Sequence, residues 1–239
     1  MDKGQGNDNL EMLRELLTAH TFNNEVQVDD QLLSFLVQIG HTSQLLRNIY
    51  RAIRRREATY VYQPLLGSSI EFKFKYDEQQ VTFQKATMEM SITMDDFLFL
   101  LGSADAVYAP VLPLGTVLVL DKRMLAPEIT KPFENKDFKV LITGRKIPLS
   151  GDYANYLIDY VTRLWPYGEL PETEPLMVSN MMIERVDQLG PTDEFADGFS
   201  ENILHTNQLV EGRLSTAFMA SALAKKLVAA IQNEGNETA

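Results

Sequence analysis

The chain has 239 residues, and its 45% hydrophobic content is enough for a buried core in one large or two small domains. Its 33 acidic residues outnumber its 22 basic residues and give a formal net charge of -11. Nucleic acid and anionic membrane surfaces are therefore disfavoured as partners, because both bind basic surfaces. The chain contains no cysteine, which excludes disulfides, thiolate zinc sites and cysteine nucleophiles and fits a reducing cytoplasm.

Neither a signal peptide nor a membrane-spanning segment is apparent. The N-terminus has no basic segment that leads into an apolar one, and no run of about 18 apolar residues occurs anywhere. We therefore expect a cytoplasmic protein that does not insert into a membrane.

The first part of the chain has the spacing of amphipathic helices. Residues 1–8 are polar and are expected to be irregular, and a short helix is predicted from Asn9 because leucines follow at intervals of three and four. A second helix is predicted from Asp29 or Asp30 to Gly40, where the glycine is expected to break it.

A third predicted helix ends in a run of arginines. These are Arg47, Arg51, Arg54, Arg55 and Arg56. Cations stabilise the C-terminal end of a helix dipole, so a solvated, charged helix end is the simplest interpretation. The alternative is a basic patch that docks an acidic surface, on this acidic protein itself or on a partner. Arg51, Arg54 and Arg55 are the candidates for that patch.

A β-hairpin is predicted next. Residues 70–76 alternate strictly between apolar and charged side chains, as expected of a strand with one face on a core. The apolar parity of the return strand changes near Gln84 and Lys85, which predicts a bulge or a bend within that strand of the hairpin. Thr93 is predicted to cap a short helix that ends before Gly102.

The sequence predicts an α+β fold with two units. Residues 1–105 are expected to form a unit of N-terminal helices and a β-hairpin, and residues 106–239 a small, mostly antiparallel sheet or barrel-like unit closed by C-terminal helices. Apolar runs bounded by Pro, Gly or charge predict strands at residues 115–121 and 138–147, and residues 183–189 predict a weak edge strand.

Two helices are predicted after the second sheet. The first begins around Asp193, and the second runs from Arg213 to Gln232 with an apolar stripe that includes Leu214 and Phe218. That stripe either closes the core or offers a surface to a partner helix. Residues from Asn233 onward are expected to be frayed.

The sequence contains no catalytic constellation. The three histidines are isolated, and none has a second histidine four residues away as in a helical zinc motif. The Gly-rich phosphate loops and the hydrolase nucleophile elbow are absent. We therefore expect a non-enzymatic protein with no catalytic residue, no metal site and no cofactor.

Aromatic side chains are the best candidates for protein binding, because aromatic anchors carry much of the energy of an interface. Trp165 and Tyr167 lie close together in the second unit, and Phe195 and Phe199 lie in the predicted helix near Asp193. A position in a small core is an equally good interpretation for each of them, and stacking on a ligand ring is a third.

Several short motifs occur between residues 110 and 200. They are Leu112-Pro113-Leu114-Gly115-Thr116-Val117, Lys139-Val140-Leu141-Ile142-Thr143-Gly144-Arg145, Asp159-Tyr160-Val161, Pro166-Tyr167-Gly168, Met177-Val178-Ser179-Asn180 and Ile183-Glu184-Arg185-Val186. In these motifs the chain resembles an uncharacterised bacterial domain family of Firmicutes. That family is encoded in type VII secretion gene clusters, beside polymorphic toxins with an LXG export domain.

The resemblance is partial. It does not cover residues 1–105, the chain has an insertion at residues 124–136, and it has Ser179-Asn180 where family members often have Asn-His. The family has no assigned catalytic residues, so none is transferred to this chain.

The resemblance implies an accessory role in toxin export. Proteins exported by that system carry a Trp-x-Gly turn and a Tyr-x-x-x-Asp/Glu signal, whereas this chain has Trp165-Pro166-Tyr167 and no tyrosine followed by an acid four residues on. It is therefore expected to stay in the cytoplasm. The leading hypothesis is a chaperone or targeting adaptor that binds an LXG toxin, and the acidic surface suits a basic client. The alternative is an immunity protein that binds and neutralises the toxic domain.

Overall fold

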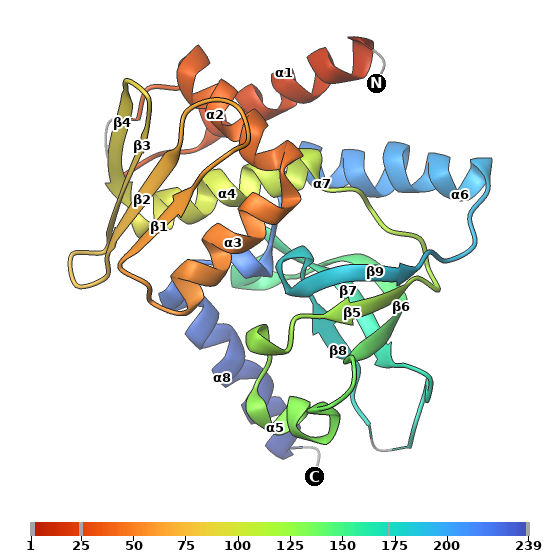
Figure 1. Cartoon of the computed structure of the whole chain (residues 1–239). Helices are drawn as coiled ribbons and strands as arrows, with labels where there is room; N and C mark the ends of the chain where they lie inside the picture. The colour runs from red at the N-terminus through yellow and green to blue at the C-terminus, as the bar shows by residue number, and fades with distance from the viewer. Residues whose placement is uncertain (1–2, 24–25, 172, 238–239) are drawn as a thin grey trace.

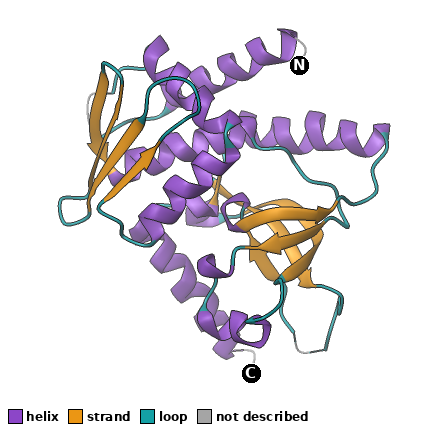
Figure 2. Cartoon of the chain, viewed as in Figure 1, coloured by secondary structure: helices purple, strands orange, loops and turns teal. Residues whose placement is uncertain are grey.

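A computed structural model describes residues 3–23, 26–171 and 173–237, and it has the expected α+β architecture. Helices and a four-stranded antiparallel sheet come from the first half of the chain, and a second sheet and further helices come from the second half (Figures 1 and 2). None of the helices in these residues is long and apolar enough to cross a lipid bilayer.

The N-terminal half combines four helices with one sheet. The helices are α1 (Lys3–Ala19), α2 (Asp30–His41), α3 (Ser43–Arg54) and α4 (Met94–Tyr108). The strands are β1 (Thr59–Tyr62), β2 (Ile70–Lys75), β3 (Gln80–Lys85) and β4 (Met88–Thr93), and they pair in chain order.

Helix boundaries in this half differ from the sequence predictions at three places. Helix α4 passes its predicted end at Gly102 and continues to Tyr108. Helix α1 already begins at Lys3, within the segment expected to be irregular, of which residues 1–2 lie outside the described part. Helix α2 begins after its cap Asp29, as predicted, but continues through Gly40. A Cβ atom at Gly40 would lie 2.2 Å from the Tyr108 ring, so this glycine permits close packing of α2 on α4 rather than breaking the helix.

The prediction of a bulge or a bend within one return strand near Gln84 and Lys85 is wrong. The chain instead makes a tight turn at Ala86 and Thr87, and the segment forms two paired strands, β3 and β4. The turn lacks the Asn or Gly that usually marks such turns, although Ala86 has a φ of 52°. Strand β1 was not predicted at all.

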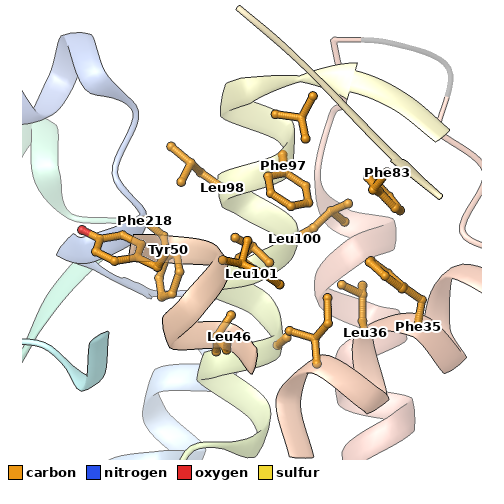
Figure 3. Close-up of a cluster of buried hydrophobic side chains, with 14 of the residues drawn as sticks. Phe35, Leu36, Leu46, Tyr50, Phe83, Phe97, Leu98, Leu100, Leu101 and Phe218 are labelled. Atoms are coloured by element: carbon orange, nitrogen blue, oxygen red, sulfur yellow. The ribbon is translucent and has the colours of Figure 1, made fainter. Parts of the chain in front are cut away.

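Helix α4 lies at the centre of the main core. Thr93 caps it, as predicted, by accepting a hydrogen bond from the Asp96 backbone N–H at 3.1 Å. Side chains on α4 contact aromatic and aliphatic residues on two sides (Figure 3). These neighbours are Phe35, Leu36 and Phe83 on one side and Leu46, Tyr50 and Phe218 on the other.

The main core contains residues from both halves of the chain. Helix α4 continues to Tyr108, so the position predicted as a domain boundary, residue 105, lies within it. Leu209, Leu214 and Phe218 belong to the same cluster of buried residues as the N-terminal helices.

The second sheet has the strand order β10-β7-β6-β5-β9, and β8 pairs with β7. Its strands are β5 (Val117–Leu120), β6 (Lys139–Pro148), β7 (Tyr156–Leu164), β8 (Leu176–Val178), β9 (Ile183–Gln188) and β10 (Leu214–Ser215). Every pair is antiparallel except β10 with β7, which agrees with the predicted, mostly antiparallel sheet. Strand β9 is at the edge, as expected.

The insertion between β5 and β6 is more regular than expected. It contains the short helix α5 (Pro127–Thr130) and two single 3-10 turns. The Lys122 ammonium donates to the carbonyl oxygens of Phe133, Glu134 and Lys136 at 2.9, 3.0 and 3.1 Å. These hydrogen bonds tie the two ends of the insertion together.

The C-terminal part contains two helical segments. Helix α6 (Glu194–Phe199), a π-helical segment from Ser200 to His205 and α7 (Thr206–Val210) follow one another without a break. The first of them begins near Asp193, as predicted, and Asp193 is its cap. We call this continuous helix the rod. Helix α8 (Ser221–Glu237) follows later.

The predicted start of the last helix is wrong. Leu214 lies in strand β10 and Phe218 in a 3-10 turn, and both side chains are buried. Their spacing of four residues resembles one helical face, but the first of them pairs with β7 instead. Helix α8 also continues past Asn233, where fraying was expected.

Candidate functional site

The rod carries an exposed apolar stripe. Phe195 is 82% exposed, Phe199 41%, Ile203 45% and Val210 78%. Their spacing of four, four and seven residues places them along one side of a helix. At about 1.5 Å per residue, the stripe is about 22 Å long. We call these four residues the rod stripe.

The opposite side of the rod is fixed to the body of the protein. Arg145 Nη1 donates to Ser200 Oγ at 2.8 Å, and His205 Nε2 donates to the Ala106 carbonyl oxygen at 2.8 Å. Leu209 is buried in the main core. The rod is therefore held in place by its buried side, while the side chains of the stripe are 41 to 82% exposed. In Figure 1, α6 extends away from the rest of the protein.

The other aromatic candidates lie at a different place. Trp165 is 42% exposed and Tyr167 59% exposed, just beyond the end of β7. Together with Phe133 and Lys139 they border a hollow of about 540 Å³. Trp165 and Tyr167 therefore lie at one surface feature, and Phe195 and Phe199 lie at another.

Arg51 docks an acidic residue of the protein itself, which is one of the two alternatives left open by the sequence. Its Nη2 lies 2.6 Å from Asp121 Oδ2, and Arg123 Nε lies 2.7 Å from Asp121 Oδ1. Burial raises the pKa of Asp121, but the hydrogen bonds from Arg123 and the charges of both arginines outweigh it, so the pKa lies below its ordinary value. Arg51 thus joins α3 to the second sheet.

Arg54 and Arg55 remain at the surface. Arg55 lies 3.8 Å from Glu57, a distance typical of a weak, exposed ion pair. Arg54 has no ion pair within the described residues and borders a groove between α3 and α8.

A buried charged cluster was not predicted from the sequence. Lys146 Nζ lies 2.9 Å from Asp159 Oδ1, and both side chains are almost completely buried. Asp159 Oδ2 accepts hydrogen bonds from Ser215 Oγ at 2.5 Å and from the Asn180 backbone N–H at 3.3 Å. The cluster joins β6, β7 and β10 next to α4.

Asp105 on α4 adds a second carboxyl group to this cluster. Its oxygens accept from Asn180 Nδ2 at 3.3 and 3.2 Å. Burial, followed by the charge of Asp159, raises the pKa of Asp105 to about 7, although the nearby charge of Lys146 opposes the rise. Asp105 also borders a pocket of about 340 Å³ that His41, Arg47 and Tyr108 help to line. This carboxyl group can exchange a proton near neutral pH.

The sequence contained a signal for this cluster. Asp105 follows Ala104 and precedes Ala106 and Val107 inside an apolar helix, and Asp159 lies within an apolar strand. Charges in apolar runs indicate buried, paired groups. The sequence alone does not show that Asp105 and Asp159 meet, because 54 positions (159 minus 105) separate them in the chain.

Among the residues that the structure describes, no group of three or more His, Asp or Glu side chains is arranged to hold a metal ion. Comparisons of the chain with protein-family models, curated proteins and solved structures gave no match.

Proposed function

We propose that the chain is a non-enzymatic, cytoplasmic accessory protein of a type VII secretion system, and that it acts as a chaperone or targeting adaptor for an LXG toxin. The resemblance of residues 110–200 to a family from such gene clusters suggests the system. The rod stripe is the observation that carries the binding role, because it is an apolar surface on a helix that is otherwise anchored.

The size of the stripe fits a partner interface. Burying a large aliphatic or aromatic side chain stabilises a complex by about 1.5 to 3 kcal/mol when the side chain was fully exposed. Phe195 and Val210 are close to that limit, and Phe199 and Ile203 are about half exposed. Together they offer several kcal/mol, from which the entropy cost of association is subtracted. The net charge of -11 would also attract a basic client over long range.

The test is co-purification of the tagged chain with an LXG toxin encoded beside it, using the export domain and the toxic domain of that toxin separately. The adaptor role predicts that the export domain is retained. The double variant Phe195→Asp and Phe199→Asp should lose it, because the interface would then bury two carboxylates.

A matched control replaces two other exposed apolar residues with the same acid. Leu65 and Leu66 in the β1–β2 loop are 103% and 92% exposed, so Leu65→Asp with Leu66→Asp makes the same chemical change away from the rod. This control should bind like the wild type. Retention of the toxic domain alone would instead indicate an immunity protein and would contradict the adaptor role.

A further inference from the structure

A groove of about 630 Å³ lies between the C-terminal end of α3 and the first turns of α8. Its floor is apolar and includes Tyr50, Leu98 and Met219, and Val228 on α8 forms part of its wall. Val228 is 54% exposed, so the wall of the groove is accessible to solvent. In Figure 1 the C-terminal end of α3 and the start of α8 lie at the lower left, and α6 extends to the right.

The charge of the groove is opposite to that of the protein. Arg54, Arg56 and Lys225 line it, and no acidic residue does so among those described. None of these three cations forms an ion pair within the described part of the chain. In a chain with 33 acidic and 22 basic residues, three unpaired cations around one apolar groove form a distinct positive surface.

One wall of the groove is held in a fixed arrangement. The Tyr76 hydroxyl lies 3.3, 3.4 and 3.0 Å from the carbonyl oxygens of Ala52, Ile53 and Glu57, at the end of α3. The Arg56 guanidinium lies over the Tyr76 ring, 4.7 Å from its centroid. The cation is therefore positioned at the groove before any partner arrives, which lowers the entropy cost of binding.

We propose that this groove binds an amphipathic helix with an acidic polar face, supplied by another protein. A helix fits a groove between two helices, since its apolar residues can pack on the floor while its carboxylates meet the flanking cations. Arg54 is on α3, Arg56 is in the turn that follows it and Lys225 is on α8, so the cations match charges spread over successive turns of a bound helix. A fatty acid carries one carboxylate and would leave the other cations unpaired.

This inference rests on the groove alone. It gives the protein a second binding surface that prefers acidic partners, whereas the acidic remainder of the protein favours basic ones. The rod stripe is not part of it, so failure of either proposal leaves the other unaffected.

The test uses two synthetic helical peptides with the same leucines on the apolar face. One peptide has glutamate on its polar face and the other has lysine. Fluorescence anisotropy of labelled peptides measures binding to the full-length protein. The glutamate peptide should bind, with an affinity that falls as salt is raised. Any binding of the lysine peptide should come from the acidic remainder of the protein and should not weaken when cations of the groove are reversed.

The chain offers closely matched charge-reversal variants. Arg54→Glu with Lys225→Glu reverses two cations that line the groove and should weaken binding of the glutamate peptide by about tenfold or more. Arg55→Glu with Lys226→Glu makes the same change at the adjacent positions, which do not line the groove, and should leave affinity within about twofold. Circular dichroism of all variants checks that they remain folded.

Failure of the glutamate peptide to bind, or equal loss of its binding in the two double variants, would overturn the proposal. A third arm uses laurate as the probe. If laurate bound and the glutamate peptide did not, the groove would be a lipid site, and the proposal of a helical partner would be refuted.

Discussion

Replacing Asp105 with asparagine should remove a loss of stability that the wild type suffers as pH rises. The unfolding free energy of the variant, minus that of the wild type, should therefore increase from acidic to alkaline pH. Asp105 is buried, and its pKa is raised from 3.8 to about 7. In the unfolded chain the same carboxyl group loses its proton near its ordinary pKa. Between these two values the folded protein holds a proton that the unfolded chain does not, so rising pH favours unfolding.

The magnitude follows from the two pKa values. The stabilising contribution of the neutral carboxyl is fully present below pH 3.8 and is lost as pH rises through about 7. One pKa unit corresponds to about 1.4 kcal/mol. Between pH 5 and pH 8 this group should lower the unfolding free energy of the wild type by about 2 to 3 kcal/mol. The Asp105→Asn variant lacks that loss, and its amide can still accept from Asn180.

Urea unfolding followed by far-UV circular dichroism, at several values between pH 5 and pH 8, measures this difference. Other titrating groups are common to both proteins, so their effects cancel in the comparison. The exposed Asp77→Asn variant in the β2–β3 turn is the control and should follow the wild type. A stability difference between Asp105→Asn and wild type that stays constant with pH would refute the reasoning.

Three further changes test how the core is assembled. Asp159→Asn should destabilise the protein by about 3 to 5 kcal/mol in urea unfolding, because it leaves the buried Lys146 ammonium without its carboxylate; a loss below about 1 kcal/mol would contradict this. Gly40→Ala should cost about 1 to 3 kcal/mol in thermal or urea unfolding, since its Cβ would overlap the Tyr108 ring, and adding Tyr108→Ala should restore part of the loss. Phe218→Ala should cost about 3 to 5 kcal/mol and reduce hydrogen-exchange protection in α4, whereas unchanged protection there would show that Phe218 does not support the N-terminal core.

The sequence predicted those elements whose signals are local. Strand β2 has strict alternation, and the caps Asp29, Thr93 and Asp193 each accept a backbone N–H at the start of a helix. Such features depend on residues within a few positions of each other, so they can be read from one stretch of chain.

Other elements depend on distant partners. Strand β10 has only two residues, too few to show alternation, and it exists because β7 lies beside it. Gly40 was interpreted as a helix break because a glycine inside a helix lowers its stability, whereas its reason is the ring of Tyr108 on another helix.

The candidate site could be predicted only in part. The sequence identified Phe195 and Phe199 as possible anchors, but the exposure of one helical face depends on what covers the other, and Arg145, His205 and Leu209 were not predictable as its anchors. The partners of Asp105 and Asp159 are Lys146, Asn180 and Ser215, which come from three separate segments of the chain. Their approach is a property of the whole fold.

The core around α4 also constrains how the protein can be made on the ribosome. Synthesis proceeds from the N-terminus, and domains commonly fold as units while the rest of a chain is still being added. Here Leu209, Leu214 and Phe218 are needed to cover α4, yet they are translated about one hundred residues after it. The part of α4 that contacts these three residues therefore stays uncovered in the nascent chain until synthesis is nearly complete, even after the N-terminal helices and the first sheet have been made.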